Sequence, residues 1–142
     1  MLFNREEISR LELAQPRTKT ILILQHTLNR WNFMLKNTRF GEVHYIHPSD
    51  EDPSNWQLNE FTNQVETRDQ TFGAKIITDA LISFEVNSYF TLSLGGNNLF
   101  NIYPDKHSHS ANTSSGNFVY SRRVQQFGVR GASYLLKLNF TI

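Results

Sequence analysis

The feature that most constrains the fold of this chain is a two-residue alternation of apolar and polar side chains. It is clearest over residues 71–86 (TFGAKIITDALISFEV), where even positions are mostly apolar and odd positions mostly polar. Successive side chains of a strand point to opposite faces, so the pattern predicts a strand between two different environments. Residues 132–142 alternate in the same way, with apolar side chains at even positions up to Ile142.

The alternating segments form two candidate hairpins, each closed by a short turn that begins with Asn. The segments are residues 19–28, 31–45, 71–86 and 89–101, with turns at 29–30 and 87–88. Asn and Ser favour tight turns between strands. Together with the C-terminal segment, the hairpins predict an all-β fold, an antiparallel meander of about five long strands.

The connections between these segments alternate in length. Residues 46–69 and 102–119 have no sustained period and read as long loops, whereas the two turns are tight. All long loops would therefore lie at one end of the meander, an asymmetry typical of outer-membrane barrels. We find no internal repeat and no domain boundary, which predicts a single segment over residues 1–142.

Composition excludes several function classes. The formal net charge of the 142 residues is +1, which leaves no bulk electrostatic attraction to nucleic acid. The absence of cysteine excludes disulfides and thiolate metal sites. The longest aliphatic run, residues 21–24, is too short for a transmembrane helix, and the charged N-terminal segment lacks the apolar stretch of a signal peptide.

Several short motifs resemble those of one protein family. Residues 95–106 (GGNNLFNIYPDK) resemble the penultimate-strand motif of TonB-dependent outer-membrane receptors, the plug-and-barrel transporters. Further stretches also resemble the family, and they follow one another along the chain in the same order as in the family. They are QPRTK (15–19), NTRFGEV (37–43), TFGAKIITD (71–79), YSRRVQQFGVRG (120–131) and LKLNFTI (136–142). The resemblance spans the chain and corresponds to the C-terminal end of such a barrel.

The resemblance implies a segment of a larger transmembrane β-barrel in the bacterial outer membrane. Barrels of this family have 22 strands around a plug, so we expect the rest of the barrel and the plug domain to belong to a longer parent chain. About five strands cannot close a barrel alone. This segment would supply barrel wall, outer loops and the C-terminal assembly signal. The family generally ends in Phe or Trp, whereas this chain ends in Ile142.

The resemblance also implies a function and partners for the parent. It would take up a scarce nutrient, with a ferric siderophore as the default cargo and cobalamin or glycans as the other usual ones. Its partners would be a TonB-type energy-coupling complex acting through the plug, outer-membrane lipid and the barrel-assembly machinery. No cofactor and no nucleic-acid partner is expected.

The two faces of such strands have different surroundings, because lumen-facing and lipid-facing residues alternate in outer-membrane barrels. The candidates for facing the lumen are polar: Lys75, Asp79, Ser83, Glu85, Thr91, Ser93, Asn97 and Lys137. The candidates for facing lipid are apolar: Phe72, Ile76, Ile82, Phe84, Phe90, Leu92, Leu94, Tyr134, Leu136, Leu138 and Phe140. Aromatic residues near the strand ends, Trp31, Tyr89, Phe90 and Tyr134, are candidates for an interfacial girdle.

Histidine and acidic clusters are the candidate cation sites of the chain. His107 and His109 stand two positions apart, and His44 and His47 form a second pair, but no carboxylate pair accompanies them at a fixed spacing. The acids of residues 50–69 lack the spacing of a calcium loop. We therefore expect solvated loop residues and no metal site.

No Ser-His-Asp arrangement or general acid–base pair stands out, so no enzymatic activity is expected. One alternative stays open, a soluble antiparallel β-barrel domain that binds an apolar small ligand. There the apolar face would point inward and the polar face toward water, which inverts every assignment above. Membrane partitioning, and protection of the apolar face in detergent-free solution, separate the two hypotheses.

Overall fold

The computed structural model describes residues 5–141 of the chain. They form two compact units, each built from three separate stretches of sequence. The sheet unit comprises residues 19–39, 76–103 and 130–141, and the loop unit comprises residues 5–18, 40–75 and 104–129. The sequence carries no boundary signal for this division because neither unit is a continuous segment.

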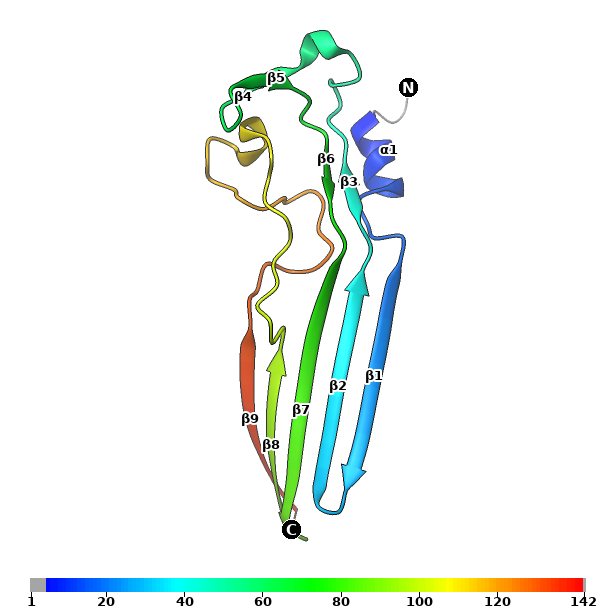
Figure 1. Cartoon of the computed structure of the whole chain (residues 1–142), viewed down its shortest axis with the longest axis vertical. Helices are drawn as coiled ribbons and strands as arrows, with labels where there is room; N and C mark the ends of the chain where they lie inside the picture. The colour runs from blue at the N-terminus through cyan, green and yellow to red at the C-terminus, as the bar shows by residue number, and fades with distance from the viewer. Residues whose placement is uncertain (1–4, 142) are drawn as a thin grey trace. The chain divides into compact units, whose positions relative to one another are not determined.

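The sheet unit contains one five-stranded antiparallel sheet. Its strands are β1 (Lys19–Leu28), β2 (Trp31–Phe40), β7 (Lys75–Asn87), β8 (Phe90–Asn97) and β9 (Ser133–Phe140), in the spatial order β1-β2-β7-β8-β9. Figure 1 shows them side by side, from blue β1 to red β9. The predicted all-β fold with an antiparallel meander of five strands is confirmed. Its place in a larger transmembrane barrel stays a prediction.

Both predicted hairpins are present, and each turn contains two residues. The first turn is Asn29-Arg30, as predicted, with Asn29 in the left-handed region at φ 50° that Asn tolerates better than most residues. The second turn is Ser88-Tyr89, one residue later than predicted. A register shift after Glu85 pairs Asn87 with Phe90, which keeps Asn87 in β7.

The C-terminal alternating segment forms β9, which pairs with β8 along its whole length, from Ser133 opposite Asn97 to Phe140 opposite Phe90. Ile142, the last residue of the expected assembly signal, lies outside the described residues. Over residues 5–141, no helix is both long and apolar enough to cross a membrane.

The loop unit is built from short elements. They are α1 (Arg5–Glu12), β3 (Val43–Tyr45), η1 (Pro53–Asn55), β4 (Gln57–Asn59), β5 (Gln64–Glu66), β6 (Gln70–Phe72) and η2 (Ser110–Thr113). β3 pairs with β6, and β4 pairs with β5, both in antiparallel fashion. The prediction of an irregular loop over residues 46–69 missed the β4–β5 hairpin, because strands this short show no alternation.

A small apolar core lies in the loop unit. Its buried members are Ala14, Val43, Tyr45, Phe72 and Val124. Phe72 is only 2% exposed and lies opposite Val43 in the β3–β6 pair. The prediction that Phe72 faces lipid is therefore wrong. The alternation of residues 71–86 is continuous in sequence, but the chain leaves one sheet after Phe72 and enters another at Lys75.

Candidate functional site

The register of β7, β8 and β9 places the remaining apolar candidates on one face of the sheet, here named the apolar face. Rows across the three strands run Phe84–Leu92–Leu138 and Ile82–Leu94–Leu136. By alternation along each strand, the same face carries Ile76, Phe90, Tyr134 and Phe140. Leu136 is 64% exposed and Phe140 72% exposed. A contiguous exposed apolar surface of this kind marks a contact surface.

The apolar face extends onto β2 and is interrupted there by a polar pair. The ring of Trp31 lies 4.6 Å from that of Phe84, centroid to centroid. Further along the same two strands, Thr78 Oγ1 donates a 2.7 Å hydrogen bond to Asn37 Oδ1. Trp31 and Asn37 share a face of β2 by alternation. The hydrogen bond between Asn37 and Thr78 therefore explains why a polar residue follows apolar ones on that face of β2.

The opposite face, here named the polar face, carries most of the predicted lumen-facing residues. Ser83, Ser93 and Lys137 are consecutive partners across β7, β8 and β9. The Oγ atoms of Ser83 and Ser93 are 2.8 Å apart, and Ser93 is buried, whereas Lys137 is exposed. By alternation, the same face carries Asp79, Glu85, Thr91 and Asn97.

Lys75, also predicted to face the lumen, is the first residue of β7 but falls in the loop unit, which includes the chain up to this residue. Its Nζ lies 2.5 Å from Asp105 Oδ1, and the other oxygen of Asp105 accepts a 2.8 Å hydrogen bond from the Gly73 amide. Burial opposes ionisation of Asp105, but the hydrogen bonds from Lys75 and Gly73 outweigh it and lower the pKa of that carboxyl. Asp79 pairs instead with Lys36, at 3.5 Å, in the sheet unit.

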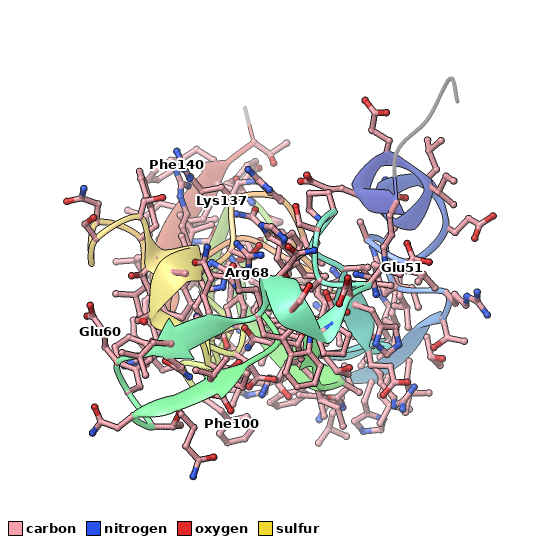
Figure 2. All side chains as sticks on the ribbon, turned by 90° about the horizontal axis from the view of Figure 1, so that it is seen from above. Glu51, Glu60, Arg68, Phe100, Lys137 and Phe140 are labelled. Carbon is pink, nitrogen blue, oxygen red and sulfur yellow. The ribbon has the colours of Figure 1, made fainter. Side chains whose placement is uncertain are left out.

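A buried ion pair organises the loop unit. Asp50 accepts hydrogen bonds from Arg68 Nε at 3.0 Å, from Arg68 Nη2 and from the Arg68 amide, and both residues are buried. Figure 2 labels Arg68 near the middle of the view and the exposed Glu60 near its left edge. Burial favours the neutral acid, but the hydrogen bonds and charge of Arg68 prevail and hold the pKa of Asp50 at about 2.

The loop unit also contains a cavity of about 180 Å³, here named the basic cavity, that is lined by cationic and polar side chains and by no carboxylate. Its nitrogen-rich lining residues are His47, Arg68, His107, Arg122 and Arg123. Burial lowers the pKa of both His47 and His107, so these imidazoles are neutral at neutral pH. An arrangement of this kind can offer hydrogen-bond donors to an anion.

The expectation that the clustered histidine and acidic residues are solvated is wrong for His109 and Asp50, which are both buried. His109 is buried, with Nε2 3.2 Å from the Gln57 carbonyl oxygen and Nδ1 accepting from the Ala111 amide at 3.1 Å. Glu66 accepts hydrogen bonds from Asn59 and Thr62. Over residues 5–141, no group of three or more His, Cys, Asp or Glu side chains is arranged to hold a metal ion.

Sequence reasoning missed the basic cavity, because its arginines come from segments that read as irregular loops. One signal was present in the composition: the chain has no Asp or Glu after Asp105, while Arg122 and Arg123 are adjacent. No family model matches the sequence, and no curated protein or solved structure matches it either.

Proposed function

We propose that this chain is a stretch of outer-membrane β-barrel wall, with the apolar face toward lipid and the polar face toward the barrel lumen. The parent would be a receptor resembling TonB-dependent transporters, which takes up a scarce nutrient such as a ferric siderophore. The two-faced register of β7, β8 and β9 is the observation that carries this proposal. The motifs of residues 95–106 and 120–131 support the family assignment.

The lengths of β1, β2 and β7 also support the proposal. β1 and β2 have 10 residues each and β7 has 13, while β8 and β9 have 8. A tilted membrane-spanning strand needs about 9–11 residues, whereas strands of globular proteins average about 5–6.

The sheet edges support an incomplete barrel. Among residues 5–141, no strand pairs with the outer edge of β1 or of β9. Backbone groups at an open edge have no hydrogen-bond partner in lipid, so further strands must cover both edges in a membrane. The rest of the parent barrel is the partner that fits this requirement.

The exposure of the apolar face favours the lipid-facing hypothesis over a soluble β-barrel. A soluble barrel needs its apolar side chains in an enclosed interior. Here Leu136, Leu138 and Phe140 are all exposed. Lipid would cover such a face without any further protein layer.

A single-cysteine scan of β9 tests the proposal, because the chain has no cysteine of its own. The variants are Leu136→Cys, Lys137→Cys, Leu138→Cys and Asn139→Cys, four consecutive positions whose side chains are all exposed. The chain is refolded into phospholipid vesicles, and each cysteine carries a fluorophore that nitroxide-labelled lipid quenches. We expect strong quenching at 136 and 138 and weak quenching at 137 and 139.

The two polar positions serve as matched controls, since they differ from their neighbours only in the face they occupy. Equal quenching at all four positions or a reversed pattern would contradict a membrane wall. Protection of 136 and 138 from a water-soluble maleimide in detergent-free solution, with the chain monomeric, would instead identify a soluble barrel.

A further inference from the structure

We propose that the basic cavity of the loop unit binds a small anion carrying a carboxylate or phosphate group. The cavity is formed entirely by loop-unit residues, so this inference does not depend on the membrane proposal. Three guanidinium groups and two imidazoles line it, and no Asp or Glu does. The anion would contact Arg122 and Arg123 directly.

Arg122 supplies the uncompensated positive charge. Its guanidinium lies 3.7 Å from the centroid of the Phe118 ring, and none of the ion pairs seen among residues 5–141 includes it. Stacking on an aromatic face orients the planar guanidinium while leaving its N–H groups free at the edge. Such a fork matches the two oxygens of a carboxylate or phosphate.

Arg123 is held in place but keeps donors to spare. Its Nη1 donates to Tyr45 Oη at 3.0 Å and to Glu6 Oε1 at 2.6 Å. A guanidinium has five N–H donors, so Nη2 and Nε stay available to a ligand. Arg68 differs, because Asp50 occupies both its Nε and its Nη2, whereas Glu6 and Tyr45 contact only Nη1 of Arg123. Arg68 is therefore a positioning residue in the wall of the cavity.

Two neutral groups complete the donor set. The Nδ1 atom of His107 is buried and has no hydrogen-bond partner, which is rare for a buried polar atom. Ser121 Oγ accepts hydrogen bonds from the amides of Arg123 and Val124, at 3.3 and 3.1 Å. Its hydroxyl hydrogen is consequently left to donate elsewhere. An anion in the cavity would satisfy both groups.

The size of the cavity limits the ligand. About 180 Å³ leaves room for several water molecules. A free phosphate or a compact organic acid fits this volume. Phosphate and citrate are therefore suitable probes, one for each of the two anionic groups.

Isothermal titration calorimetry of the full chain, in low-salt buffer without phosphate, tests the proposal with each probe separately. We expect saturable binding of phosphate, citrate or both, at one site per chain. Arg122→Gln should weaken that binding about tenfold, because it removes a charge-assisted hydrogen bond. Arg130→Gln is the matched control, since it removes the same charge from the sheet unit and should leave the affinity unchanged.

A second measurement needs no variant. NMR follows the imidazole pKa of His107 during titration with whichever of phosphate and citrate binds. This pKa should rise, because a nearby anion favours the charged ring. The ring resonances of His26, an exposed residue of β1, should not respond to the probe. Absence of binding of both probes, equal weakening by Arg122→Gln and Arg130→Gln, or equal shifts at His107 and His26 would each overturn the proposal. Binding of one probe alone would assign the anionic group.

Discussion

Replacing Asp50 by Asn tests the physical account of the loop unit most directly. The carboxylate of Asp50 is fully enclosed and receives hydrogen bonds from Arg68 and from Thr67 Oγ1 at 3.2 Å, and His47 Nδ1 lies 3.2 Å from its Oδ1. Asn keeps the volume of the side chain but removes its charge. The buried Arg68 guanidinium then loses its counter-charge, and an amide NH₂ replaces one of its acceptors.

Two independent arguments set the expected loss in the free energy of unfolding. Removing one partner of a buried ion pair costs about 3–5 kcal/mol, and Asn retains one acceptor oxygen, which favours the lower end. The pKa of Asp50 falls from 3.8 to about 2 in the folded chain, which corresponds to about 2 kcal/mol of stability from ionisation. We therefore expect Asp50→Asn to lower the free energy of unfolding by about 2–3 kcal/mol at neutral pH.

The same pKa shift predicts a pH dependence. The folded-state pKa lies below the unfolded value, so the contribution of Asp50 is fully present above about pH 5. It is lost as the pH falls through 3.8 toward about 2. The Asp50→Asn variant lacks this group and should lose less stability than the wild type over that interval.

Trp56 provides a local probe for the assay. Its Nε1 donates to the Asp50 carbonyl oxygen at 3.3 Å, and the second of the two tryptophans, Trp31, lies in the sheet unit. A Trp31→Phe background leaves Trp56 as the sole tryptophan, so urea unfolding followed by its fluorescence reports the loop unit. Glu51→Gln, at the exposed neighbouring position, is the charge-matched control.

The reasoning is refuted if Asp50→Asn unfolds at the same urea concentration as the Glu51→Gln control. It is also refuted if wild type and Asp50→Asn lose stability in parallel as the pH is lowered from about 5 to about 2. Either result would mean that the Asp50–Arg68 pair contributes nothing beyond what a neutral hydrogen-bonded pair supplies.

Two further predictions concern close backbone approach and the polar face. Gly41→Ala should lower stability by about 1–3 kcal/mol, because a Cβ there would lie 2.5 Å from Thr18 Oγ1 and 3.1 Å from the Thr18 carbonyl oxygen. Gly128→Ala meets open space and should be neutral in the same thermal unfolding assay. Ser83→Ala and Ser93→Ala should each cost about 1 kcal/mol, and the double variant should cost little more than either, because it leaves no hydroxyl unpaired. Additive losses in that double-mutant cycle would show that the 2.8 Å contact is not a stabilising hydrogen bond.

The sequence by itself determined the strands of the sheet and which residues share a face. An alternation with period two is a local property, since neighbouring side chains of any extended segment point in opposite directions. Leu136 and Lys137 could therefore be assigned to opposite faces without knowledge of the partner strand. The turn at Asn29-Arg30 was equally local, because Asn tolerates the backbone conformation that the turn requires.

Only the tertiary structure decided at which residue the alternating side chains pass from one environment to another. Phe72 continues the pattern of residues 71–86, yet it is buried in the loop unit because the chain changes sheets after it. The basic cavity shows the same limit, since Arg68 and Arg122 are distant in sequence and neither lies in a periodic segment. Local patterns specify which way a side chain points along its own strand. The residues that this side chain contacts in the folded chain depend on how separate segments pack, and periodicity does not encode that packing.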